Sequence, residues 1–194
     1  MILSHNDYLH YLESDRIALK KKKRTIKYNI LDKLDPDYIW RFQRLLRKCE
    51  YYKNVKSVSF LNQIFYIYLK LKFKKLSLKL GFTIPENVFG PGLAIIHYGT
   101  IIVNAEARVG SNCRIQACTV IGQSGGIKGS PTIGDNVYIA PGVKIYGEIN
   151  IPNNTAIAAN AAVNKSFVNE NTLIGGVPAK EISHINIKQI IKHI

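Results

Sequence analysis

His97 is the residue in the middle of this chain whose type best suits acid–base chemistry near neutral pH. The other four histidines lie near the two ends of the chain: His5, His10, His184 and His193. An imidazole can take the proton of a hydroxyl group while that hydroxyl attacks a carbonyl carbon. A structural interpretation competes with this one. His97 stands six residues before Val103, which would put it at an interior position of the repeat described below, where a buried imidazole needs a polar partner.

Other residues of reactive type have less informative spacing. Gly125, Gly126 and Lys128 suggest a phosphate loop, but the Gly-x-x-x-x-Gly-Lys-Ser/Thr spacing is absent, so we expect a flexible loop beside a ligand cleft. Cys118 has the chemistry of a nucleophile, yet no histidine stands near it in the sequence. The three cysteines and five histidines show no Cys-x-x-Cys or His-x-x-x-His spacing, which argues against a metal site and a disulfide framework.

Aliphatic residues recur at every sixth position over the second half of the chain, with a single interval of twelve. They are Val103, Val109, Ile115, Ile121, Ile133, Ile139, Ile145, Ile151, Ile157 and Val163. Mostly small or β-branched residues stand four positions later: Cys113, Thr119, Val137, Val143, Ile149, Thr155 and Ala161. Neither a helix nor an alternating strand has this period. It predicts a parallel β-helix, in which three short strands and three turns make one coil and successive coils stack.

Charge divides the chain at the start of the repeat. Residues 1–82 contain 19 Lys and Arg against 7 Asp and Glu, a net of +12, whereas residues 83–194 contain 8 against 6, a net of +2. We therefore predict a basic helical region over residues 1–82, a β-helix over 83–183 and a short tail over 184–194. The sequence has no apolar run of 18 residues and no secretory pattern at its start, so we expect a cytoplasmic protein.

Two helices are predicted in the basic region. The first follows Asp35 and Pro36, which resemble a cap and a first-turn proline, and its apolar residues recur at spacings of three and four. The second covers the stretch FLNQIFYIYLKLKFKKLSLKLGF. Its length favours a helix, although the alternation in its later part leaves a strand open.

The second of these segments has two interpretations. In one, its apolar residues pack inside the protein and its lysines lie in solvent. In the other, the segment contacts an anionic membrane, which would place the protein at the inner membrane face. The apolar residues are Phe65, Tyr66, Tyr68, Leu69 and Phe73, and the charged ones are Lys70, Lys72, Lys74, Lys75 and Lys79. No nucleic-acid-binding motif accompanies the charge, so we expect no nucleic-acid partner.

Three stretches carry a resemblance to a known family: FGPGLAIIHYGTIIVN, TIGDNVYIAPGVKIYGEINI and the closing IGGVPAKEI. Over residues 83–183 the chain resembles the hexapeptide-repeat acyltransferases, and within them it is similar to the serine acetyltransferases. The resemblance implies a left-handed β-helix, an O-acetyltransferase that transfers acetyl directly from acetyl-CoA, and a homotrimer with sites between subunits. It implies that His97 is the general base.

The resemblance also implies roles for weaker candidates. Around the acceptor we expect Glu86, Tyr98, Asn104 and Lys128, with Glu86 as the nearest carboxylate upstream of His97. For the coenzyme A portion of acetyl-CoA, the matching positions are Ala140, Ala158, Ala159, Lys165, Gly176 and Lys180. The two lysines are expected to meet its phosphates.

The sequence departs from the serine acetyltransferases at two places. Thr83 stands near the position of an aspartate that orients the histidine in that family, and Gly129 and Ser130 stand where an arginine–histidine pair is expected. The chain therefore looks like the short acetyltransferases of surface-polysaccharide assembly, with a sugar hydroxyl as acceptor. One alternative is a serine O-acetyltransferase of cysteine biosynthesis, acting on L-serine. Another is a non-catalytic basic scaffold or membrane-binding protein.

Overall fold

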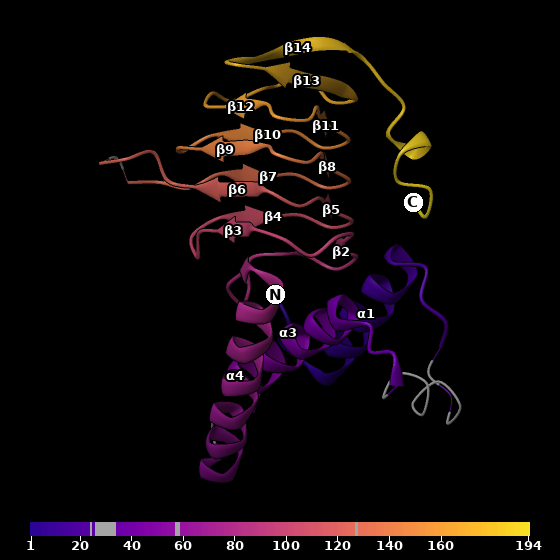
Figure 1. Ribbon diagram of the computed structural model, residues 1–194, viewed down its shortest axis with the longest axis vertical. Helices are drawn as coiled ribbons and strands as arrows, with labels where there is room; N and C mark the ends of the chain where they lie inside the picture. Colours follow the sequence, from indigo (N-terminus) through magenta and orange to yellow (C-terminus); the bar gives the residue numbers. More distant parts are fainter. Residues whose placement is uncertain (24, 26–33, 57–58, 127) are drawn as a thin grey trace.

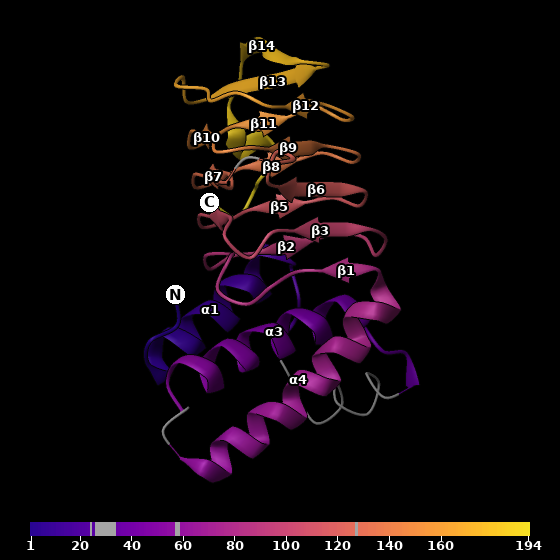
Figure 2. The same ribbon diagram turned by 90° about the vertical axis from the view of Figure 1, so that its left-hand side faces the viewer.

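The repeat region winds into stacked coils that form a left-handed parallel β-helix, with helices at one end (Figures 1 and 2). The computed structural model describes residues 1–194 except 24, 26–33, 57–58 and 127. Each full coil contributes one short strand to each of three sheets, so that the chain passes from the first sheet to the second, then to the third, and back to the first.

The sheets are built from very short strands. The first sheet contains β1 (Phe82–Thr83), β3 (Ile101–Val103), β6 (Thr119–Gly122), β9 (Lys144–Tyr146) and β12 (Ala162–Val163). The second contains β4 (Arg108–Val109), β7 (Thr132–Ile133) and β10 (Asn150–Ile151). The third contains β2 (Ala94–Ile95), β5 (Arg114–Ile115), β8 (Tyr138–Ile139), β11 (Ala156–Ile157), β13 (Thr172–Gly176) and β14 (Ala179–His184). Within these sheets all pairs are parallel except the antiparallel pair of β13 and β14.

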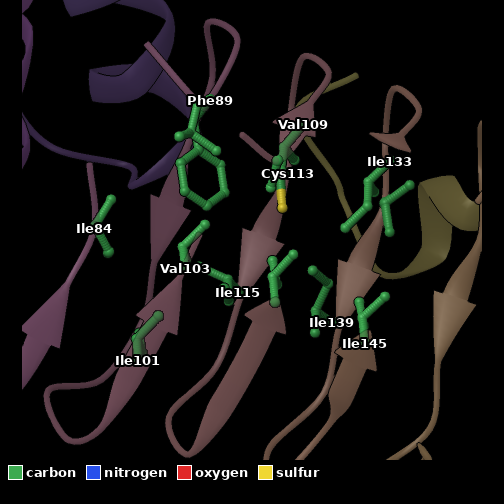
Figure 3. Packing of buried hydrophobic residues seen from close by; sticks show 14 of the residues in the cluster. Ile84, Phe89, Ile101, Val103, Val109, Cys113, Ile115, Ile133, Ile139 and Ile145 are labelled. Atoms are coloured by element: carbon green, nitrogen blue, oxygen red, sulfur yellow. The ribbon is translucent and has the colours of Figure 1, made fainter. Parts of the chain in front are cut away.

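The ten aliphatic residues of the six-residue repeat all lie inside the coils, as predicted. Parallel pairing in register stacks Val103 on Ile121 and Ile121 on Ile145, and Figure 3 shows the interior side chains of successive coils pointing into one column. The residues four positions after them are buried as well. Because a single coil cannot bury its own interior face, this column is what holds the coils together.

Asparagines support the turns between the second and third sheets. Asn112, Asn136 and Asn154 each have a positive φ, of 58°, 57° and 56°. Their side-chain amides form a ladder, in which Asn112 donates to Asn136 and Asn136 donates to Asn154, both at 2.9 Å. Asparagine tolerates the left-handed conformation better than most residues, so the ladder satisfies polar groups and backbone geometry together.

Three helices of the described region close the end of the β-helix that begins at β1. They are α1 (His5–Ala18), α3 (Tyr38–Asn54) and α4 (Phe60–Leu80). The predicted start of α3 is wrong by two residues, because Asp37 and not Asp35 caps it: the Asp37 side chain accepts a hydrogen bond from the Trp40 N–H at 3.0 Å. The second predicted segment, residues 60–82, is helical from Phe60 to Leu80, where Gly81 follows with φ 76°, and its last residue, Phe82, begins β1.

Polar side chains of α1 and α3 bind the open backbone edge of the first coil. Gln43 donates to the Leu93 carbonyl at 2.7 Å and accepts from the Ile95 N–H at 3.0 Å, in the place of a neighbouring strand. Arg47 is fully buried, pairs with Asp15 at 2.8 Å, and donates to the carbonyl oxygens of Phe89 and Gly90. The helical region therefore caps a sheet edge that would otherwise be free to pair with another chain.

The apolar residues that α4 exposes are not the ones that the membrane interpretation expected. Leu69 and Phe73 are buried, and the partly buried Phe65 and Tyr66 pack against the core, so four of the five proposed lipid-facing residues contact the protein interior. A different set is exposed along the helix: Phe60, Leu61, Ile64, Ile67, Tyr68, Leu71 and Leu78. In the described part of the chain no helix is both long enough and apolar enough to span a bilayer.

The tail folds back along the outer face of the third sheet. Ile187 and Ile191 are buried there against Ala156 and the partly buried Tyr138 and Leu173. Figure 1 shows this segment returning beside the coils toward α1.

Candidate active site

His97 lies in the turn between β2 and β3, at the edge where the chain passes from the third sheet to the first. Ile95 fills the interior position in this coil, because it pairs with Ile115 in the third sheet. Eight positions separate Ile95 from Val103, whereas six separate Ile115 from Ile121. The two additional residues displace His97 from the interior, so the placement suggested by counting back from Val103 is wrong.

The His97 side chain is exposed and available to a ligand. Within the described part of the chain it has no hydrogen-bond partner, and it borders none of three cavities, of about 320, 260 and 550 Å³, formed by those residues. Tyr98 follows it at the same turn, with 73% of its surface exposed. His97 and Tyr98 therefore stand on an open edge of the molecule.

We call this edge the His97 edge and define it by the turns at 96–100, 116–118, 140–143 and 158–161 and by the end of β13. Backbone hydrogen bonds align these turns. The N–H groups of Ile96, Gln116, Ala140 and Ala158 donate to carbonyl oxygens of the next coil, those of Ile115, Ile139, Ile157 and Ile174. Three of the predicted coenzyme positions, Ala140, Ala158 and Ala159, thus lie on the same edge as His97.

Small residues keep the His97 edge free of bulk. A Cβ atom added at Gly99 would lie 3.3 Å from the Ala117 Cβ, and one added at Gly175 would lie 2.7 Å from the Ala158 Cβ. Close packing between adjacent turns therefore requires glycine at these two positions, whereas Ala159 and Gly176 are exposed on the edge. Strands of neighbouring coils are about 4.8 Å apart, so the four steps from His97 to Gly176 cover roughly 19 Å.

Gly176 and Lys180 complete this edge at the far end. Gly176 ends β13 and pairs with Ala179 of β14, and Lys180 pairs with Gly175 and is exposed. A cation at this place can meet an anionic group of a ligand that extends from His97 along the edge.

Lys144, the first residue of β9, reaches the His97 edge with its side chain, and sequence reasoning did not select it. Its ammonium donates hydrogen bonds to the carbonyl oxygens of Cys118 and Gly142, which belong to adjacent turns. In the repeat it occupies an ordinary outward strand position. Its ammonium reaches this edge because the turns at Cys118 and Gly142 lie next to each other in adjacent coils.

Four predicted residues lie elsewhere, at the edge where the chain passes from the first sheet to the second. They are Glu86, Asn104, Lys128 and Lys165. The Asn104 side chain accepts a hydrogen bond from the Glu106 N–H at 2.8 Å, and the Lys165 ammonium lies 5.6 Å from the centre of the Phe167 ring. Within this chain the structure does not bring these residues together with His97.

Glu86 belongs to a cluster that joins the helices to the first coil. It pairs with Lys70 at 2.7 Å and with Lys53 at 3.3 Å, and accepts a hydrogen bond from the Tyr66 hydroxyl at 3.1 Å. Burial and the Glu86 charge raise the pKa of Tyr66. Glu86 is thus engaged in structure at a different edge, and this placement does not support a role in orienting His97.

The described residues of the loop, 123–126 and 128–131, leave the coils after β6 (Figure 1). Gly129 has φ 110°, and a Cβ atom there would lie 2.5 Å from the Glu148 Cβ. An arginine therefore does not fit at position 129 with this backbone. Thr83, the other departure from the serine acetyltransferase pattern, is an exposed residue of β1.

Within the residues that the structure describes, no three His, Cys, Asp or Glu side chains gather in a way that would hold a metal ion. The three cysteines are free thiols, and burial raises the pKa of both Cys49 and Cys113 to about 12. Cys118 is exposed at the His97 edge with φ 61°.

Comparisons with known proteins find serine acetyltransferases by sequence and by structure. Serine acetyltransferase from Staphylococcus epidermidis is 37% identical over 93 residues, which are 47% of this chain and 44% of the relative. That from Staphylococcus xylosus is 36% identical over 93 residues, 47% of this chain and 43% of the relative. The chain thus matches less than half the length of these curated relatives. No family model matches it.

Solved serine acetyltransferases share the fold over nearly the whole chain. A coenzyme A complex of the enzyme from Brucella abortus aligns with a TM-score of 0.68 and 26% identity, covering 93% of this chain and 70% of that one. The enzyme from Vibrio cholerae aligns with a TM-score of 0.72 and 18% identity, covering 96% and 70%. The likeness confirms the predicted fold class, a left-handed β-helix with a helical N-terminal region.

Proposed function

We propose that this protein is an acetyl-CoA-dependent O-acetyltransferase of the serine acetyltransferase type. The observation that carries the proposal is the exposed His97 at the start of an edge lined by small residues and ending at Lys180. The similarity to serine acetyltransferases, including one solved with coenzyme A, supports the same reaction and acetyl-CoA as co-substrate.

The chemistry assigned to His97 is general-base catalysis. Its imidazole takes the proton of the acceptor hydroxyl while the hydroxyl oxygen forms a bond to the acetyl carbon. The carbon–sulfur bond of the thioester then breaks, and the imidazolium returns the proton to the departing thiolate. The reaction therefore leaves His97 neutral and ready for another cycle.

Acetyl-CoA is proposed to lie along the His97 edge. Ala140, Ala158, Ala159 and Gly176 let its pantetheine arm approach the backbone, and Lys180 meets a phosphate. Lys165 lies at a different edge, so its predicted role requires a second subunit.

The acceptor best supported by the comparisons is L-serine, because the relatives found are serine acetyltransferases. A sugar hydroxyl is the second candidate. It is favoured by the Gly129 backbone, which leaves no room for the arginine expected next to a serine carboxylate. A thiol-release assay with acetyl-CoA that compares L-serine, nucleotide sugars and oligosaccharide fragments decides between them. If none of these acceptors causes thiol release, the result would favour the non-catalytic scaffold.

A homotrimer is proposed because the His97 edge is open on one side within a single subunit. A neighbouring coil wall would enclose His97 and could bring Lys128 or Lys165 toward the ligand. Light scattering should give three times the chain mass. A fully active monomer at micromolar concentration would exclude this arrangement.

Peripheral contact with an anionic membrane is proposed for α4, with a corrected set of residues. The exposed apolar side chains recur at spacings of three and four, beside the exposed Lys72, Lys74, Lys75 and Lys79. Apolar contact and lysine charge act together at the surface of an anionic bilayer.

Vesicle co-sedimentation tests this contact. Anionic vesicles should bind more protein than neutral ones, and replacing Leu61, Ile64 and Leu71 together with serine should weaken binding to both kinds of vesicle. The control is Val168→Ser, which removes an exposed apolar residue of the β-helix. Equal binding by all three proteins would show that α4 does not contact lipid.

A further inference from the structure

A cavity of about 260 Å³ lies between the end of α1, the start of α3 and the third sheet. Its lining residues are Ala18, Leu19, Lys20, Lys21, Asp37, Ile39, Ile95, Ile96 and Arg114. Ile96 belongs to the His97 edge and immediately precedes His97, so the cavity adjoins this edge, although His97 itself does not line it. A volume of this size holds a small group and not a whole nucleotide.

Cations outnumber anions in this cavity. Lys21 pairs with Asp37 at 2.5 Å, which uses the one carboxylate among the lining residues. Arg114 is half-buried on the outer face of β5, and in the described part of the chain neither Arg114 nor Lys20 has an ion pair or a side-chain hydrogen bond. Both cations are therefore available to an anion, and a hydrogen bond between a cation and an anion is stronger than one between neutral groups.

The C-terminal tail contributes His193, whose imidazole is affected by the charges of Arg114 and Lys20. The Nε2 atom of His193 is buried and has no hydrogen-bond partner within the described residues. Burial, followed by the charges of Arg114 and Lys20, lowers the pKa of His193. The region around the cavity is therefore electropositive, and the neutral imidazole can report on any anion that enters.

We propose that this cavity binds an anionic group of the acceptor, a carboxylate or a phosphate, through Arg114 and Lys20. Only one part of this inference rests on the proposed function, namely that the bound anion belongs to the acceptor of the transferase. An anion held here lies against Ile95 and Ile96, and the remainder of the acceptor can extend past Ile96 to the His97 imidazole. Arg114 offers a planar pair of donors that suits either anion.

The test measures anion binding without acetyl-CoA, so its result does not depend on transferase activity. The His193 ring signal, assigned with a His193→Gln variant, is followed by NMR during titration with inorganic phosphate and, separately, acetate. Anion binding should raise the pKa of His193, because it offsets the positive charges that lower it. The anion with the tighter binding identifies the preferred group, carboxylate or phosphate.

Arg114→Gln and Lys20→Gln should each weaken anion binding by about tenfold or more, since charge-assisted hydrogen bonds are lost. Arg108→Gln is the matched control, because Arg108 lies in the same coil on the second sheet and donates to the carbonyl oxygens of Ala105 and Ala107. It should bind anions as the wild type does. Equal affinities for all four proteins, or no effect of either anion on His193, would overturn the proposal.

Where an acidic acceptor is turned over, Arg114→Gln should raise KM for that acceptor with little change in kcat. The KM for a neutral acceptor should stay constant. If anions bind but no acceptor is acetylated, the proposed anion site is retained and the transferase proposal fails. Failure of the anion site and failure of the transferase proposal are therefore distinguishable.

Discussion

Cys118 is a natural reporter of the His97 edge because it lies one coil from His97 and is exposed. Cys49 and Cys113 are buried, and their raised pKa keeps them as thiols at neutral pH. Iodoacetamide should therefore modify only Cys118 in the folded protein, as peptide mass spectrometry can verify. Acetyl-CoA should slow this modification if it occupies the edge.

The control for this labelling experiment is Ala159→Glu, which places bulk and negative charge on an exposed turn of the same edge. It should leave the basal labelling rate of Cys118 unchanged and remove the protection by acetyl-CoA. Protection that persists in Ala159→Glu, or its absence in the wild type, would mean that acetyl-CoA binds elsewhere.

Arg47 is the residue whose loss should most destabilise the junction between helices and coils. Replacing it with methionine leaves the buried carboxylates of Asp15 and Glu50 without their partner, which typically costs about 3–5 kcal/mol. Urea unfolding measures the change. Lys53→Met, which removes a half-exposed partner of Glu86, should cost less than about 1 kcal/mol. Similar losses for the two variants would contradict this account of the junction.

At the scale of elements, the asparagine ladder should contribute measurably to the stability of the turns. Asn136→Ala removes two hydrogen bonds and leaves alanine at φ 57°, so we expect a loss of about 2 kcal/mol in the free energy of unfolding. Asn136→Gly loses the same bonds without the unfavourable φ and should be less destabilising than alanine. Unchanged urea midpoints in both variants would show that the ladder does not stabilise the coil.

The interior of the β-helix was predictable from the sequence because one aliphatic residue is needed at the same place in every strand. The turns were less predictable. Nothing in the six-residue period shows that the connection from Ile95 to Val103 carries two additional residues, and these bring His97 to the surface. The interior period therefore predicts strands better than it predicts the residues between them.

The faces of α4 show a second limit of sequence reasoning. Phe65, Leu69 and Phe73 recur at a spacing of four and pack inward, whereas Leu61, Ile64 and Leu71 form another apolar row on the same helix. A helix with two apolar faces gives no sign in its sequence of which face meets the protein. That choice depends on α3 and β1, where Phe42 contacts Phe73 and Phe82 with ring centroids 5.1 and 5.0 Å apart.

At the scale of the whole molecule, the basic region and the β-helix have complementary roles. The helices cap the first coil through Gln43 and Arg47, and the tail covers the outer face of the third sheet. Both leave the His97 edge open. The basic helical region thus serves as a structural cap, and its α4 also exposes apolar side chains at the end of the molecule opposite β14 (Figure 2).

The most direct test of the account is acetyl transfer by His97→Ala. With the acceptor that the wild type uses, turnover should fall by about 10²-fold to 10⁴-fold, since general-base assistance is lost. Because His97 is exposed, the variant should unfold at the wild-type urea concentration and still protect Cys118 when acetyl-CoA is added. A folded His97→Ala protein that transfers acetyl at close to the wild-type rate would contradict the central claim.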